Sequence, residues 1–125
     1  MSLEGFAAIF DSRGVSLASA GVCNRAFRKD DALAALRELE GTGIRVIGAE
    51  ASLLERSGTF NYHVSWWTCD PREHETAEER MERYLEAARQ FVEEYPDFDQ
   101  VYYSFTLDSE EWSMHLSQSI PDAIG

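Results

Sequence analysis

Residues 43–70 read GIRVIGAEASLLERSGTFNYHVSWWTCD, and this stretch decides the fold. Two runs rich in β-branched and aromatic residues flank a turn-forming cluster at residues 55–58, so the stretch predicts a β-hairpin. The second run alternates, which places residues 60, 62, 64 and 66 on one face of the strand and residues 61, 63, 65 and 67 on the other. We expect Trp66 in the core and Trp67 on the open face. There the Trp67 side chain either packs under the tail or the N-terminal helix, or anchors a binding surface.

Helical patterns lie on both sides of this hairpin. Residues 30–40 carry apolar side chains at i, i+3, i+4 and i+7 spacing. Residues 77–95 carry a longer stripe of the same kind, and Thr76 with Glu79 predicts a capping box at its start. Residues 100–107 alternate again and predict a further strand.

The remaining segments give weaker patterns. They predict a short helix at 3–10, a loop at 11–14, extended or irregular chain at 15–27, and a tail that frays from about residue 117. Trp112, Met114 and Leu116 recur at period two, which allows a short fourth strand. The chain therefore predicts a single α+β domain over residues 1–125, with a small, mainly antiparallel sheet of three to four strands and two main helices packed on one face.

The charge of the chain limits its partners. Among 125 residues, 23 are acidic and 11 are basic, and residues 70–99 hold eleven of the acidic ones. A net charge of −12 disfavours nucleic acid and anionic membranes and suits a basic protein partner. With two cysteines, no signal-peptide pattern and no apolar run of membrane-spanning length, the sequence predicts a cytoplasmic protein.

Catalytic and metal-binding patterns are weak. Cys69, Glu73 and His74 lie close together downstream of His63, but their spacing matches no zinc signature. The sequence has no GxSxG elbow and no phosphate-binding glycine loop followed by Lys and Ser/Thr. We therefore predict no cofactor and no enzymatic activity.

Two alternatives to protein binding stay open at this stage. The first is a small-ligand-binding or enzymatic domain that uses a groove between sheet and helix, with Glu50, His63 and Tyr103 as its polar groups. The second is a homodimer that pairs through the exposed face or edge of the sheet.

The order of the motifs resembles a known family. Residues 21–27 (GVCNRAF), 46–50 (VIGAE) and 62–69 (YHVSWWTC) are followed by an amphipathic helix and an aromatic strand. Over about residues 15–107 this order is similar to the immunity protein 40 family of bacterial polymorphic-toxin systems. The resemblance points to these motif positions: Asn24, Gly48, Glu50, Trp66 and Cys69. Of these, we interpret Gly48 as a close backbone approach and Trp66 as a core anchor.

The resemblance implies a cytoplasmic immunity protein that protects its producer by binding a cognate toxin, often one delivered by contact-dependent or type VI secretion. We expect this toxin to be basic and the contact surface to combine the open sheet face with the acidic helix. The candidate partner-binding residues are Trp67, Glu50, Glu73, Glu78, Glu82 and Glu86.

Overall fold

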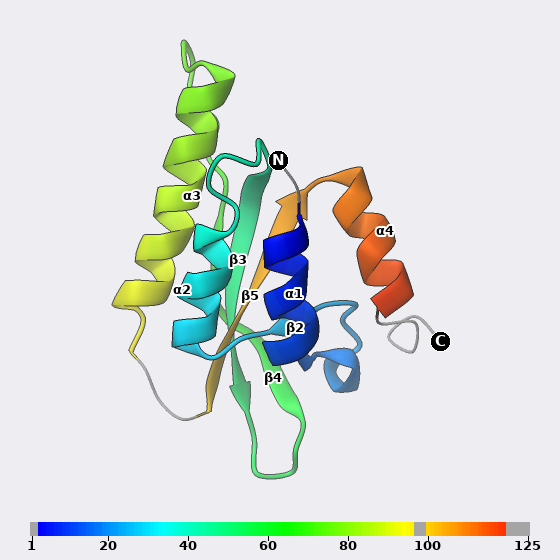
Figure 1. Ribbon diagram of the computed structural model, residues 1–125. Helices are drawn as coiled ribbons and strands as arrows, with labels where there is room; N and C mark the ends of the chain where they lie inside the picture. The colour runs from blue at the N-terminus through cyan, green and yellow to red at the C-terminus, as the bar shows by residue number, and fades with distance from the viewer. Residues whose placement is uncertain (1–2, 97–99, 120–125) are drawn as a thin grey trace.

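The structure is a computed structural model that describes residues 3–96 and 100–119. In chain order its elements are α1 (Glu4–Arg13), β1 (Val15–Ser16), the 3₁₀ helix η1 (Ala18–Ala20), β2 (Arg25–Ala26), α2 (Lys29–Arg37), β3 (Arg45–Leu54), β4 (Phe60–Thr68), α3 (Ala77–Glu94), β5 (Val101–Asp108) and α4 (Glu110–Ser119) (Figure 1).

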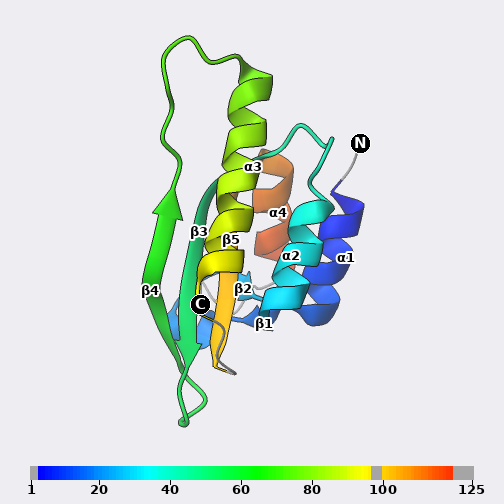
Figure 2. The same ribbon diagram turned by 90° about the vertical axis from the view of Figure 1, so that its left-hand side faces the viewer.

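A three-stranded antiparallel sheet of order β4-β3-β5 forms the centre of the fold. Figure 2 shows α1, α2 and α3 together on one side of this sheet. β1 and β2 form a separate antiparallel pair, and reciprocal 2.7 Å backbone hydrogen bonds between Phe27 and Tyr103 join the chain after β2 to β5. This arrangement confirms the predicted α+β class.

The main core lies between the sheet and the helices. Ala49 and Ala51 of β3 and Ala88 of α3 are fully buried in it, and such small side chains let a helix approach the sheet closely. A smaller cluster of Leu17, Ala26 and Phe60 lies apart from the main core. Its partly buried members come from the η1 segment and from β3, β4 and β5, so the chain around η1 covers part of the outer sheet face.

The local signals for the hairpin and for the long helix are confirmed. In the turn, the Glu55 amide donates to the Thr59 carbonyl at 2.9 Å, and Gly58 has a φ of 88°, which favours glycine. At the start of α3, the Thr76 and Glu79 side chains each accept the other residue's amide at 3.1 Å. These reciprocal bonds satisfy two amides that a helix start otherwise leaves unpaired.

The chain near α1 differs from the prediction. Residues 11–13 continue the helix, so the predicted loop there is wrong. Phe6 and Phe10 are buried on one face of α1, and Arg13 forms an ion pair with Asp31 of α2 at 3.2 Å. These contacts hold the last turn of α1 against the rest of the domain.

The predicted fourth strand is also wrong, because Trp112, Met114 and Leu116 lie on the helix α4. The Ser109 side chain accepts the Trp112 amide at 3.1 Å, which caps the helix start. Trp112 is buried while Met114 is 65% exposed, so the apolar side chains do not share one face as strand alternation requires. α4 runs to Ser119, and the part of the expected frayed tail beyond it lies outside the described residues.

At the end of β4 the two faces are the reverse of the prediction, and farther back a register shift opposite Ala51 and Leu53 interrupts the alternation, so that Val64 packs against the main core. Trp67 lies opposite Ala49, which is part of the main core, and its ring packs edge-on against Tyr84 of α3 at 5.9 Å. Trp66 is 58% exposed. Alternation separates two faces without saying which one the helices cover, and the small residues of β3 on the helix side gave no hydrophobic signal.

Candidate functional site

A row of three side chains crosses the outer face of the sheet, opposite α2 and α3. In the strand register, Glu50 of β3 lies opposite both Trp66 of β4 and Ser104 of β5. Directly paired residues project to the same face with their Cβ atoms about 5 Å apart. The strands therefore hold an indole, a carboxylate and a hydroxyl side by side.

The middle of this row is a buried carboxylate. Glu50 is 9% exposed, and the hydroxyl of the fully buried Ser104 donates to its Oε2 at 3.3 Å. Burial of a carboxylate is costly unless polar groups surround it, and Ser104 supplies one of them. Next to this polar centre, Trp66 exposes a large apolar surface, a combination typical of binding hot spots.

Tyr62 of β4 belongs to the same region. Burial, together with the negative charge of Glu50, raises the pKa of its hydroxyl to about 12. The phenol therefore stays protonated across the physiological pH range. Tyr62 can thus act as a hydrogen-bond donor, while Glu50 supplies acceptor oxygens.

Two of the three residues of the alternative ligand groove, Glu50 and Tyr103, lie on opposite faces of the sheet. Tyr103 is paired with Ala51 and is buried in the main core, whereas Glu50 projects to the outer face. The side chain of His63 lies outside the described part of the chain. Among the described residues, no cluster of three His, Cys, Asp or Glu side chains is placed to hold a metal ion.

Three of the predicted acidic residues lie on the other side of the sheet from Glu50 and Trp66. Glu78, Glu82 and Glu86 are exposed on α3, where they line a hollow between α2 and α3. Glu73 is exposed in the loop before α3 and is not part of that lining. The single surface expected from the sequence is therefore two surfaces, one on each side of the sheet. Within the described ranges, no helix is both long and apolar enough to cross a membrane.

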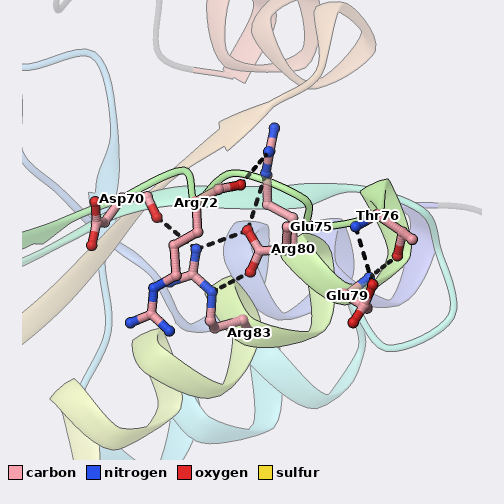
Figure 3. A network of polar contacts seen from close by, with 7 residues as sticks. All are labelled: Asp70, Arg72, Glu75, Thr76, Glu79, Arg80 and Arg83. Atoms are coloured by element: carbon pink, nitrogen blue, oxygen red, sulfur yellow. Dashed lines mark hydrogen bonds and ion pairs between the residues drawn. The ribbon is translucent and has the colours of Figure 1, made fainter.

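An ion-pair network fixes the loop between β4 and α3 (Figure 3). Glu75, whose side chain is 10% exposed, accepts from Arg80 at 3.3 Å and from Arg83 at 3.0 Å. The same two arginines donate to the backbone carbonyls of Arg72 and Asp70. The hydrogen bond from Arg83 is the largest cause that lowers the pKa of Glu75, from 4.5 to about 2.

The network predicts a specific pH dependence of stability. Because the pKa of Glu75 is lower in the folded protein, the stabilisation by its charged form is complete above the ordinary pKa and is lost as the pH falls toward 2. We expect Glu75→Gln to lower the free energy of unfolding at pH 7 by an amount that shrinks between about pH 5 and pH 2. Urea denaturation at a series of pH values measures this difference.

Glu78→Gln is the matched control, because it removes an exposed carboxylate from the first turn of the same helix. Its difference from wild type should be small at every pH. If the Glu75→Gln difference does not change with pH, the network does not hold the charged form of Glu75.

A comparison with known protein families identifies the family of this chain. The sequence model of the Immunity protein 40 family matches residues 16–107, from the second residue of β1 to the last but one of β5. The chain belongs to the immunity protein 40 family. Comparisons with curated proteins and with solved structures give no significant match.

Several motif positions of this immunity protein 40 family member have different roles from those expected. Trp66 is exposed rather than a core anchor. A Cβ on Gly48 would meet nothing closer than 3.6 Å, so the expected close approach is wrong; Gly48 instead follows a β-bulge that shifts the register with β5. Asn24 is buried and donates from its amide to the Phe105 carbonyl at 3.0 Å, which ties the η1 segment to the sheet.

The sequence analysis also missed two site residues. Tyr62 and Ser104 had no catalytic or metal motif around them. Ser104 meets Glu50 through strand pairing, and Tyr62 lies near enough for the charge of Glu50 to raise its pKa. The alternation of the two strands was the one available signal, because it placed Tyr62 on the same face as Trp66.

Proposed function

We propose that this protein is an immunity protein that binds a toxin domain of a polymorphic toxin system and blocks its activity, which protects the producing cell. The observation that carries the proposal is the family match over residues 16–107, which spans most of the chain. We place this action in the cytoplasm and expect it to depend on binding alone, without catalysis. Delivery of the toxin through a type VI or contact-dependent system fits the same proposal.

The outer sheet face is the contact surface that the geometry favours. Trp66 offers an exposed indole on β4, where pairing with Glu50 of β3 fixes its backbone before a partner arrives. Glu50 and Tyr62 supply an acceptor and a donor beside it. A rigid aromatic anchor with polar groups around it is the usual composition of an interface centre.

Electrostatics supports a basic partner. The net charge of −12 attracts a positively charged toxin over a distance of about one Debye length and raises the rate of encounter. The acidic residues Glu73, Glu78, Glu82 and Glu86 contribute to this attraction even where they do not touch the toxin. A bound protein of this kind would then cover the toxin's active site.

We expect a toxin domain to be encoded next to this gene, and the direct test uses that domain. Co-expression should restore the growth of cells that express the toxin domain, and the purified proteins should form a stable complex. We expect the association rate to fall at least about 10-fold between 50 and 500 mM NaCl, with a smaller change in the dissociation rate. Surface plasmon resonance over a salt series measures both rates.

A second acidic protein of similar size and charge, captured at the same density, is the control for unspecific charge attraction. If that protein binds the toxin domain equally well, the proposed recognition is wrong. If the cells grow no better with co-expression, the proposed immunity function is wrong.

A further inference from the structure

A groove between α2 and α3 has a volume of about 710 Å³. Its apolar lining comes from Leu36 of α2, from Leu39 in the turn after α2, and from Met81 and Leu85 of α3. The two leucines of the α2 side are 2% exposed, whereas Met81 and Leu85 are only partly buried. The groove therefore offers accessible apolar surface between two packed helices.

Carboxylates surround this apolar surface. Glu78, Glu82 and Glu86 follow one another at four-residue spacing along the α3 side, and Glu40 lies on the α2 side. All four are exposed. Within residues 3–96 and 100–119, neither Glu40, Glu78 nor Glu82 forms an ion pair with another side chain.

The two basic residues of the lining do not balance these charges. Arg89 already pairs with Glu86 and, at 2.8 Å, with Glu93. Arg37 is exposed in the last turn of α2, where a positive charge also stabilises the helix end. The groove is therefore an apolar slot with a negative rim.

We propose that this groove docks a cationic amphipathic helix of the toxin, in addition to the contact at the outer sheet face. Apolar side chains of that helix enter between Met81 and Leu85, and its Lys or Arg side chains pair with Glu40, Glu78 and Glu82. The lining of α3 runs from Glu78 to Arg89, which corresponds to about 16 Å of helix and fits a segment of about three turns. The identity of this partner rests on the proposed function.

Charge complementarity selects this occupant. The negative rim favours a cationic segment and disfavours a second copy of this chain, which carries a net charge of −12. The partner segment must also carry apolar side chains, because a purely cationic segment would leave Met81 and Leu85 in contact with water.

Methyl NMR of the methionines tests the groove directly. The probe is a synthetic 14-residue helical peptide of leucine and lysine, with leucines at i, i+3, i+4 and i+7 spacing. We expect the methyl signal of Met81 to shift until the protein is saturated, while the signal of Met114, an exposed residue of α4 outside the groove, does not move. A second peptide with serine in place of leucine keeps the charge and should bind at least about 10-fold more weakly.

Charge reversal tests the rim. Glu78→Lys with Glu82→Lys should weaken binding of the leucine–lysine peptide at least about 10-fold, because two rim contacts become repulsive. The matched control is Glu94→Lys with Glu110→Lys, which changes the net charge equally with residues outside the groove, and should change the affinity less than about 2-fold.

Three results would overturn the groove proposal: equal shifts of Met81 and Met114, equal affinity of the leucine and serine peptides, or equal weakening by both pairs of substitutions. The variant with Glu78→Lys and Glu82→Lys is also tested with the toxin domain as ligand. If it binds the toxin domain as tightly as wild type, the groove proposal is overturned and the proposed function stays intact. Failure of the wild-type protein to bind the toxin domain overturns the proposed function instead.

Discussion

Replacing Trp112 by alanine should lower the free energy of unfolding by about 3–5 kcal/mol. The indole is 2% exposed, and its ring meets Phe6 at 4.9 Å and Phe10 at 4.7 Å, both edge-on. The substitution would remove this contact area and leave a cavity between α1 and α4 that the surrounding helices fill only in part. Because a domain of this size is stable by about 5–15 kcal/mol, the loss is a large share of the total. Urea denaturation followed by circular dichroism measures it.

Met114→Ala is the matched control on the same helix. Met114 is 65% exposed, so its truncation should change the free energy of unfolding by less than about 0.5 kcal/mol. If Trp112→Ala costs no more than Met114→Ala, the helix α4 is not part of the folded core.

This prediction concerns the part of the domain outside the family match. The match ends at residue 107, while Phe6, Phe10 and Trp112 belong to the same core cluster as the sheet. The hydrogen bond or ion pair between His115 and Asp11, at 3.1 Å, adds a polar contact between the same two helices. The chain therefore completes its core with two helices that the matched region does not include.

Local signals predicted most of the elements correctly. The hairpin, the capping box at Thr76 and the alternating last strand each depend on neighbouring residues alone, and the structure has all three. The strand predicted for the tail was wrong for a physical reason. Three apolar residues at alternating positions also occur on a short amphipathic helix. Ser109, which caps α4, was the signal that favoured the helix.

Long-range contacts could not be predicted in the same way. Glu75 meets Arg80 and Arg83 because the loop folds back on α3, and nothing in the spacing along the chain requires that. Likewise, Glu50 meets Ser104 only after β3 pairs with β5. The candidate site depends on which strands are neighbours, and this is a property of the whole fold.

The assignment of the two tryptophans shows the same limit. Alternation correctly separated Trp66 from Trp67, but only the position of α3 decides which of them is covered. In our proposal Trp66 therefore takes the role of exposed anchor that the sequence analysis gave to Trp67. That Trp67 takes part in binding stays a prediction.

Replacing Trp66 by alanine should weaken binding to the toxin domain at least about 30-fold, or about 2 kcal/mol. The exposed indole is the largest apolar contribution of the outer face and stands beside Glu50, so its removal takes the anchor away from the proposed interface. Because this side chain is 58% exposed in the free protein, the free energy of unfolding should change by less than about 1 kcal/mol. Calorimetric titration of the toxin domain and urea denaturation of the free protein measure the two effects.

Trp67→Ala is the matched control, because it removes the same side chain from the next position of the same strand. Trp67 packs on Tyr84 and against the main core, so its loss should cost about 2–4 kcal/mol of stability. Below its unfolding temperature this variant should bind the toxin domain more tightly than Trp66→Ala does, since its outer face keeps the indole. Equal binding by Trp66→Ala and wild type would exclude the outer face as the interface. Weaker binding by Trp67→Ala than by Trp66→Ala would instead place the interface on the helix side, where the acidic groove lies.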